Sequence, residues 1–387
     1  MTSPRSAGFS FSVQQSDGNA RTSLLTTPHA VVACPTFMPV GTQGTVKTLT
    51  MNEVASTGAQ IVLGNTYHLW LRPGAEQIHA HGGLHKFTRW PRAMLTDSGG
   101  FQAFSLSIGK AGGGSLVKLT EDGFTFRSHL DGSKHYLSPE IAVKVQALIG
   151  ADIQMQLDVC PPGNSPRDVV ENAVRQTTRW AKRAAATERP SNQALFGIVQ
   201  GACFADLRKL HADELAAVTP AFDGLALGGF SVGEPIEKMY ETLAEVAHYV
   251  DRERPRYLMG VGTPQDLLEG IEHGIDMFDC VLPTRNARNG QALTRFGKVV
   301  IKQARYKEDM RPLDPHCSCE ACTSGYTRSY LRHLYIAKEV LVLRLFSIHN
   351  LHFYGELMKN ARAAIADGRF LAFKKQAIDE MERGEEG

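Results

Sequence analysis

Short apolar runs recur along the chain from residue 36 onward, separated by stretches long enough to form a helix. Eight runs are present: 36–40, 60–64, 93–96, 152–157, 195–199, 224–227, 257–261 and 277–281. Amphipathic stretches lie between them, among them 138–149, 166–187, 205–218, 235–249 and 264–273. Strands that are apolar throughout and alternate with helices are typical of a parallel sheet covered on both faces. The pattern therefore predicts an α/β fold of the (β/α)₈ TIM-barrel type.

The segments outside these runs predict additions to the barrel. Residues 9–34 alternate in polarity around the turn signal Ser16-Asp17-Gly18-Asn19, which predicts an N-terminal β-hairpin layer. A Gly-rich stretch at 107–136 predicts a loop and hairpin that act as a lid or binding loop over the barrel mouth. We expect four parts: an N-terminal β layer (1–35), the barrel core (36–282), a basic zinc-binding subdomain (283–350) and a C-terminal helical segment that closes the barrel (351–387).

Polar residues or glycines stand where most of the apolar runs end. They are Asn65, Asp97, Asp158, Gln200, Gly228-Gly229, Gly260-Val261-Gly262 and, inside the last run, Asp279. The carboxyl ends of the strands form one rim of such a barrel, so these residues should converge on an active site. Asn or Asp at a strand end can also simply cap the next helix. Three carboxylates and an amide on one rim favour the active site over capping.

Composition and charge add a candidate binding surface. The chain has 387 residues, 43% hydrophobic and 21% charged, as expected of a soluble enzyme. No apolar run is long enough for a membrane span, and residues 1–11 lack an apolar signal core, so we expect a cytoplasmic protein with no membrane partner. Residues 285–345 hold twelve Lys/Arg and five Asp/Glu, a net +7 against +2 for the whole chain. This segment suits a polyanion, although a solvated basic face would show the same count.

Three cysteines within six residues indicate a metal site. Cys317, Cys319 and Cys322 offer three thiolates, and tetrahedral Zn²⁺ prefers sulfur and nitrogen ligands. A fourth ligand must close the site, and His316, His333, His349 and His352 are available. We favour His349, which we expect at a helix start from which it can turn back to the cluster. Four protein ligands would make the zinc structural; the alternative is three reduced surface thiols.

Several long motifs resemble one enzyme family. They are Thr36-Phe37-Met38-Pro39-Val40-Gly41-Thr42, Leu63-Gly64-Asn65-Thr66-Tyr67-His68-Leu69, Leu95-Thr96-Asp97-Ser98-Gly99-Gly100-Phe101-Gln102, Phe278-Asp279-Cys280-Val281-Leu282-Pro283-Thr284-Arg285, and the cysteine cluster with His349. Over residues 9–380 the chain resembles the bacterial-type tRNA-guanine transglycosylases, also called queuine tRNA-ribosyltransferases. The resemblance implies the barrel, one structural Zn²⁺ per subunit, a homodimer, and exchange of guanine at the anticodon wobble position of the Asp, Asn, His and Tyr tRNAs for the deazaguanine preQ1.

The resemblance also implies roles for the rim residues. Asp279 looks like the nucleophile that forms a covalent intermediate with the ribose, and Asp97 looks like the general acid and base at the departing and incoming bases. The substrate-binding set is implied to be Asp158, Gln200, Gly229, Asn65 and the two walls of the base sandwich, Phe101 and Met259. Arg285 and Arg288 look like contacts to tRNA.

This chemistry suits these residue types. Breaking an N-glycosidic bond develops positive charge on the sugar, which a carboxylate on the opposite face can stabilise and then bond. The departing purine needs a proton, and the same acid can later deprotonate the incoming base. The resemblance implies that Val232 narrows the base pocket, because enzymes that take the bulkier queuine have Gly at this position. It also implies that Glu234 lies near the ammonium of preQ1. We therefore expect preQ1 as the incoming base, with direct use of queuine as the alternative.

Other interpretations remain for single residues. Asp279 could be a buried carboxylate that holds a loop, Asp276 is expected to be a structural cap, and the thiols of Cys160 and Cys280 are expected to pack rather than react. His85 is expected on the surface.

Three other classes of protein compete with this function. An archaeal-type enzyme would carry further C-terminal RNA-binding domains, which we do not expect in a chain of this length. A non-catalytic partner subunit would lack a catalytic Asp, but Asp97 and Asp279 are both present. An unrelated barrel glycosidase would more often use Glu as its acid and would not need a cysteine cluster beside a basic segment.

Overall fold

All eight apolar runs form strands, and the strands close into one barrel. The structure is a computed structural model that describes residues 6–102 and 117–384. The barrel strands are β4 (Thr36–Gly41), β5 (Ile61–Gly64), β6 (Ala93–Thr96), β10 (Ile153–Met155), β11 (Ala194–Val199), β12 (Gly224–Leu227), β13 (Arg256–Leu258) and β14 (Met277–Cys280). They follow the order β10-β11-β12-β13-β14-β4-β5-β6 with every neighbouring pair parallel. The predicted (β/α)₈ fold is confirmed.

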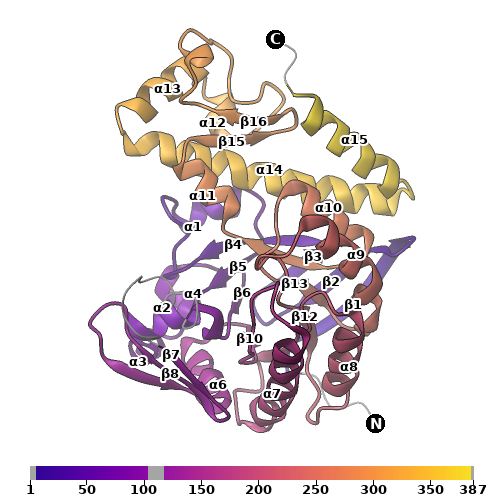
Figure 1. The fold of residues 1–387 in the computed structure, drawn as a ribbon. Coiled ribbons are helices and arrows are strands. Elements are labelled where there is room, and N and C mark those ends of the chain that lie inside the picture. The colour runs from indigo at the N-terminus through magenta and orange to yellow at the C-terminus, as the bar shows by residue number, and fades with distance from the viewer. Residues whose placement is uncertain (1–5, 103–116, 385–387) are drawn as a thin grey trace.

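The helices between the strands cover the outside of the barrel (Figure 1). The longer ones are α6 (Pro139–Ile149), α7 (Arg167–Ala186), α8 (Ala205–Ala216), α9 (Ile236–Val246) and α10 (Pro264–Glu272). Four short helices lie near the first strands: α1 (Met51–Ser56), α2 (Thr66–Leu71), α3 (Ala75–Ala80) and α4 (Leu84–Thr88). Local sequence signals mark where helices begin. At α10, for example, the Thr263 side chain forms a capping box with Asp266, and Pro264 occupies the first turn.

The barrel interior is filled by apolar side chains from alternating strand positions. Met38, Leu63, Ile153, Phe196 and Met277 belong to one buried cluster at the centre. A second cluster lies between the barrel and its helices. The barrel is therefore a packed core, and any substrate must bind at an end of it.

The N-terminal layer is a three-stranded antiparallel sheet of β1 (Ser10–Asp17), β2 (Ala20–Thr26) and β3 (Val31–Cys34). The predicted hairpin is its β1–β2 pair. Arg21 of β2 forms a buried ion pair with Asp276 (2.5 Å), and Asp276 also accepts hydrogen bonds from Ser23 Oγ (2.8 Å) and Arg256 N (2.8 Å). Asp276 directly precedes β14, so these contacts join the sheet to the amino-terminal end of the barrel. These partners of Asp276 all belong to the N-terminal sheet or to the barrel, in agreement with the expected structural role.

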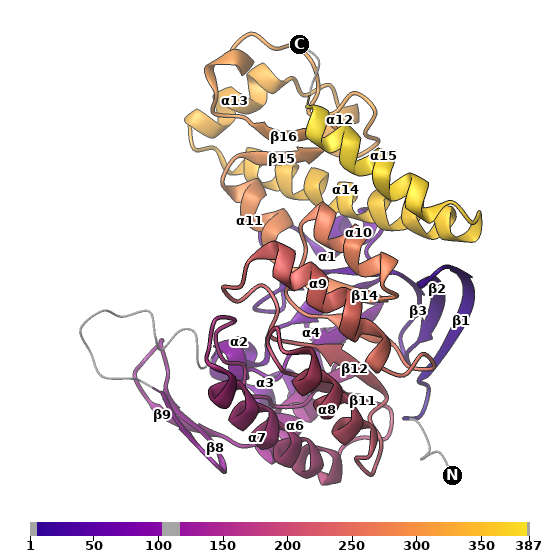
Figure 2. The ribbon, with the colours of Figure 1, turned by 45° about the vertical axis from the view of Figure 1, so that its right-hand side comes forward.

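The stretch predicted as a loop and hairpin contains one strand more than expected. β7 (Val117–Thr120), β8 (Gly123–Arg127) and β9 (Lys134–Leu137) form a second antiparallel sheet, which lies beside α2 and α7 (Figure 2). Phe124 and Phe126 of β8 pack in one buried cluster with Tyr67 of α2 and Trp180 of α7. The glycine-rich part of the predicted lid, up to residue 116, lies outside the described residues.

The chain after the barrel folds over one end of the molecule (Figures 1 and 2). Its elements are α11 (Leu282–Arg288), β15 (Gln291–Thr294), β16 (Gly297–Val300), α12 (Glu320–Thr323), α13 (Arg328–Ile336), α14 (Val340–Ala366) and α15 (Phe370–Arg383). The long helix α14 contacts α11, α12 and β15 on one side and β1, β2 and β4 on the other. It runs through position 350, so the expected zinc-binding and C-terminal segments share one helix.

Polar contacts hold α14 in this bridging position. The buried Asn350 side chain accepts from Leu293 N (2.8 Å) and donates to Pro283 O (2.8 Å) and Gln291 O (3.0 Å). Tyr354 donates to Gly262 O (2.6 Å), in the loop that follows β13. The cysteine-rich segment is thereby fixed to the rim of the barrel. Among the described helices, none is both long and apolar enough to cross a membrane.

Candidate active site

Asp97 follows β6 and lies buried in a network of hydrogen bonds. Its Oδ2 accepts from Asn65 Nδ2 (2.5 Å), and its Oδ1 accepts from the backbone N–H groups of Thr66 (2.9 Å) and Gly99 (3.2 Å). Asn65 is at the same time the N-cap of α2, where its side-chain oxygen accepts from His68 N (3.2 Å). The capping and active-site interpretations of Asn65 are therefore compatible, because one amide caps the helix and orients Asp97.

The surroundings of Asp97 raise its pKa toward neutrality. Burial raises the pKa of Asp97 to about 7, and the negative charges of Asp279 and Asp158 add to that rise against the opposing backbone hydrogen bonds. A carboxyl group with a pKa near 7 can both give and take a proton at low cost. Asp279 and Asp158 thus act on Asp97 through their charges, and all three residues lie at or just beyond the carboxyl ends of their strands.

Asp279 lies in β14 with one carboxylate oxygen fixed and the other open. Its Oδ1 accepts from Tyr257 Oη (2.6 Å) and from Gly260 N (2.8 Å). Its Oδ2 has no hydrogen-bond partner among the described residues. Burial raises the pKa of Asp279 above its ordinary value, and the hydrogen bonds from Tyr257 and Gly260 oppose that rise. The two donors aim the carboxylate and leave one oxygen available to a reacting atom.

Sequence reasoning missed Tyr257. Tyr257 lies in β13 inside the barrel, 1% exposed, with its ring among the apolar side chains of the core. Burial and the charge of Asp279 raise the pKa of Tyr257 well above its usual range. The hydroxyl therefore stays protonated and donates a hydrogen bond to Asp279. A tyrosine in an apolar strand looks like a core residue in the sequence. Its spacing, two residues before Met259 at the strand end, was the only available signal.

Asp158 and Gln200 form a second polar pair on the rim. Gln200 Nε2 donates to Asp158 Oδ2 (2.7 Å), and the backbone N–H of Gln200 is fixed by His211 Nδ1 (2.8 Å). Burial raises the pKa of Asp158 to about 6. Gln200 Oε1 is buried with no partner among the described residues, which leaves an acceptor for a bound molecule.

A glycine is required beside this pair. Gly229 follows β12 with a positive φ of 67°. A Cβ at this position would lie 2.4 Å from Gln200 Oε1, which is far inside van der Waals contact. Any side chain at Gly229 would therefore strain the backbone and displace the Gln200 amide.

The expected aromatic wall and the expected thioether wall lie at the edge of this region. Phe101 is 48% exposed and, with Asp158 and Cys160, lines a cavity of about 350 Å³. Met259 lies at the end of β13 and packs against the central core cluster. An exposed phenyl ring beside a buried carboxylate provides a surface on which a planar base can stack.

The two nearby thiols are not activated. Burial raises the pKa of Cys160 to about 12, and it does the same for Cys280. Both side chains therefore stay protonated at neutral pH, and a thiol is a weak nucleophile compared with its thiolate. Neither cysteine therefore offers a thiolate to a substrate on this rim.

Arg285 and Arg288 lie in α11, immediately after the strand that carries Asp279. Arg285 is exposed, and Arg288 donates from Nη1 to Thr284 O (2.9 Å). Neither guanidinium forms an ion pair with a described residue. Burial and the charge of Arg285 lower the pKa of Arg288 from its ordinary value. The helix that directly follows the strand of Asp279 thus carries two cations without a carboxylate partner among the described residues.

The cysteine cluster and His349 come together as predicted. Cys317, Cys319, Cys322 and His349 place four ligand atoms within 4.8 Å of one another and could hold a metal ion. His349 Nδ1 lies 3.4 Å from Cys319 Sγ and 3.3 Å from Cys322 Sγ. Its other ring nitrogen, Nε2, lies 2.9 Å from Leu293 O. That hydrogen bond places the ring proton on Nε2 and leaves the Nδ1 lone pair free for a metal.

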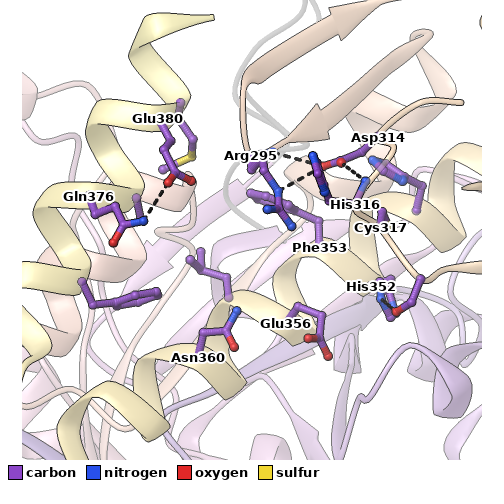
Figure 3. A pocket seen from close by; sticks show the side chains of 16 residues that line it. Arg295, Asp314, His316, Cys317, His352, Phe353, Glu356, Asn360, Gln376 and Glu380 are labelled. Carbon is purple, nitrogen blue, oxygen red and sulfur yellow. Dashed lines mark hydrogen bonds and ion pairs between the residues drawn. The ribbon is translucent and has the colours of Figure 1, made fainter. Parts of the chain in front are cut away.

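The donor set fits zinc, but the expected location of His349 in its helix was wrong. Three sulfurs and one imidazole nitrogen at such separations match a closed tetrahedral zinc site. His349 does not start a helix, because α14 already begins at Val340. A cavity of about 300 Å³ adjoins the cluster between α14 and α15, and Figure 3 shows Arg295, His316 and His352 along it. That cavity is lined by none of the rim carboxylates.

These features define a class of protein: a (β/α)₈-barrel enzyme with paired carboxylates at the strand ends and an appended metal-binding segment. The comparison with known families narrows the class. The family model for queuine tRNA-ribosyltransferase matches residues 16–383. The chain belongs to this family of transferases.

Individual relatives agree over almost their whole length. A queuine tRNA-ribosyltransferase of Sorangium cellulosum is 65% identical over 98% of this chain and 94% of its own. Proteins of the same name from Fusobacterium nucleatum and Solidesulfovibrio magneticus are 51% and 52% identical over 96% and 95% of this chain, and 98% and 96% of their own.

The coupling between the carboxylates predicts a measurable change in Asp97. Replacing Asp279 by Asn removes one of the negative charges that raise the Asp97 pKa, so that pKa should fall below about 7. Carbon-13 NMR of labelled aspartate carboxyl groups would follow the titration. Asp213→Asn, at an exposed position on α8, should leave it unchanged. An Asp97 pKa that does not respond to Asp279→Asn would contradict the proposed coupling.

Proposed function

We propose that this chain is a tRNA-guanine transglycosylase that exchanges the wobble guanine of tRNA for preQ1 by double displacement. One arrangement supports the proposal. Asp279 has one carboxylate oxygen held by Tyr257 and Gly260 and the other open, and its charge helps burial to raise the pKa of Asp97 to about 7. Base exchange at a ribose needs both a proton carrier and a nucleophile.

In the first displacement, Asp279 Oδ2 attacks C1′ of the target ribose on the face opposite to guanine. An ester bond forms between the carboxylate and C1′, the N-glycosidic bond breaks, and its electron pair leaves with the base. Asp97 donates its proton to that base. Tyr257 and Gly260 hold Oδ1 in place, so the attacking oxygen is pre-oriented.

In the second displacement, the incoming base replaces guanine. Asp97, now ionised, removes a proton from the ring nitrogen of the new base, and that nitrogen attacks C1′. The ester to Asp279 breaks and its electron pair returns to the carboxylate. The two inversions give overall retention at C1′.

Base recognition is assigned to Asp158, Gln200 and Gly229. The Asp158 carboxylate can accept from the ring N–H and the exocyclic amine of a guanine-like base, and the backbone N–H of Gly229 and the second amide proton of Gln200 can donate to its carbonyl oxygen. The unpartnered Gln200 Oε1 adds an acceptor. Phe101 and Met259 then enclose a base that has left its stack.

The tRNA contacts are assigned to Arg285 and Arg288, which can bind phosphates of the anticodon loop. We propose the Asp, Asn, His and Tyr tRNAs as the substrates. We also propose that the enzyme acts in the cytoplasm. Cys317, Cys319, Cys322 and His349 would hold one Zn²⁺. Its function would be structural, because it ties the cysteine-rich loop to α14 and so supports α11 with its two arginines.

Two residues support preQ1 over queuine. Val232 occupies the loop after β12 with a branched side chain. The carboxylate of Glu234 accepts hydrogen bonds from Ser231 N and Val232 N (3.0 Å). These bonds fix the loop and keep Val232 in place against a bulky substituent. They also keep a negative charge in reach of an aminomethyl group.

A homodimer is part of the proposal. Three large apolar side chains are exposed on α13 and at the start of α14: Tyr330 (42%), Ile336 (56%) and Val340 (67%). Burying them against a second copy would remove apolar surface from water.

Light scattering should give twice the 42.4 kDa of one chain, and Val340→Glu should shift the population toward monomer. A monomeric wild-type protein at micromolar concentration would reject the dimer.

Exchange of labelled guanine into unfractionated tRNA tests the activity itself. We expect incorporation with the unaltered chain. Asp279→Asn should abolish incorporation, and Asp97→Asn should reduce it by 10²-fold or more, on the order of the contribution of general acid–base catalysis. Asp213→Asn, on exposed α8, serves as the matched control and should exchange normally. Full activity of Asp279→Asn would refute the mechanism.

Competition between incoming bases tests the specificity. We expect preQ1 to enter tRNA and queuine to be rejected, because Val232 restricts the pocket. Val232→Gly should gain queuine incorporation while it keeps guanine exchange. Formation of queuosine in tRNA by the unaltered enzyme supplied only with queuine would overturn this specificity and leave the exchange reaction standing.

A further inference from the structure

A second group of metal-ligating side chains lies at the opposite end of the barrel from the active site. Asp152 directly precedes β10 and faces two histidines. His29 lies in the turn between β2 and β3, and His85 lies in α4. The three form the only other group of this kind found among the described residues, besides the cysteine cluster.

His85 is buried, although the sequence analysis expects it on the surface. It is 8% exposed, and its Nε2 lies 3.1 Å from Asp152 Oδ2. The physical reason is the buried carboxylate, which gives the imidazole a polar partner inside the fold. The sequence offered no sign of this partner, because Asp152 is distant along the chain and starts an apolar run.

The possible ligand atoms of these three side chains lie close together. His29 Nδ1 lies 2.6 Å from Asp152 Oδ1, while His85 Nε2 approaches Oδ2 of the same carboxylate. The two imidazole rings are stacked, with centroids 3.6 Å apart and planes at 14°. All three ligand atoms lie within 4.8 Å of one another.

The Asp152 carboxylate is held in place by the protein backbone. Its Oδ2 accepts from Met94 N (2.8 Å), in the neighbouring strand β6. A carboxylate fixed by backbone is pre-oriented for coordination.

We propose that His29, His85 and Asp152 form a binding site for a divalent transition-metal ion such as Zn²⁺ or Co²⁺. Imidazole nitrogens and a carboxylate are the ligands these ions prefer after thiolates. Ligand atoms bound at about 2.1 Å to one tetrahedral ion lie roughly 3.4 Å apart. Without an ion, the two nitrogen–oxygen separations are hydrogen-bond lengths, 2.6 and 3.1 Å. A metal ion would replace the protons of these hydrogen bonds and move the ligand atoms apart by less than about 1 Å.

The site differs in kind from the cysteine cluster. Three protein ligands leave coordination positions for water, so the ion should exchange readily, whereas a four-ligand site is closed. The His29 side chain is 42% exposed and gives the ion a route in from solvent. A bound metal ion would connect the turn of the N-terminal sheet with α4 and with the amino-terminal end of β10. It should therefore stabilise the fold and take no part in the reaction.

Cobalt binding to the untagged protein, with zinc already in the cysteine cluster, tests the proposal. We expect one further equivalent of Co²⁺, with weak visible bands and no intense thiolate-to-cobalt charge transfer. Binding should also raise the midpoint of thermal unfolding. His29→Ala removes a half-exposed ligand in a turn, so the chain should still fold, and it should lose both the extra equivalent and the thermal shift.

His79→Ala is the matched control. His79 is an exposed histidine in α3 with no partner among the described residues, and its variant should bind cobalt like the unaltered chain. The proposal fails if the unaltered chain takes up no further cobalt, if cobalt appears only with thiolate bands, or if His29→Ala binds as His79→Ala does. Guanine exchange does not depend on this result, so either proposal can fail alone.

Discussion

Three carboxylates share one partly desolvated rim, and they cannot all carry full negative charge there at neutral pH. Asp97, Asp158 and Asp279 each follow or end a different barrel strand, and burial raises the pKa of all three. Local hydrogen bonds then separate their states. Asp279 receives a tyrosine hydroxyl and a backbone N–H, while Asp97 also feels the charges of both neighbours. The same residue type thereby stands in different electrostatic surroundings on one rim, which is what the proposed division of work between Asp279 and Asp97 requires.

The remaining architecture keeps this rim in position and extends it toward a large substrate. Barrel closure pairs β14 with β4, which fixes the strand of Asp279. The helix α11 follows directly and presents Arg285 and Arg288. Helix α14 then anchors α11 and β15 through Asn350 and carries His349 to the three cysteines. A metal in that cluster would act on the reaction only through the placement of these cations.

Much of this organisation could be predicted from the sequence because it depends on local patterns. Buried parallel strands are continuous apolar runs, so all eight were identifiable, and the rule that active sites lie at the carboxyl ends of barrel strands brought Asp97, Asp158 and Asp279 together. The cysteine spacing alone indicated a metal site. The roles of single residues could not be predicted from local patterns. They came from the family resemblance and from chemistry, and the structure adds the geometry of these residues.

What could not be predicted depends on partners that are distant along the chain. Tyr257 has the appearance of a core residue until its hydroxyl is seen against Asp279. His85 looks exposed until Asp152 is placed beside it. The start of α14 at Val340 was missed because apolar residues, among them the buried Val342 and Phe346, run almost continuously up to Ile348 and leave no clear amphipathic break before His349.

The central claim is that Asp279 forms an ester with the ribose of tRNA. The most direct measurement is peptide mass spectrometry of the enzyme after incubation with tRNA alone, rapid denaturation and nuclease digestion. We expect a nucleotide remnant on the peptide that contains Asp279, with guanine released in equal amount. A remnant on Asp97 or on a cysteine, or guanine release with no adduct at any position, would contradict it.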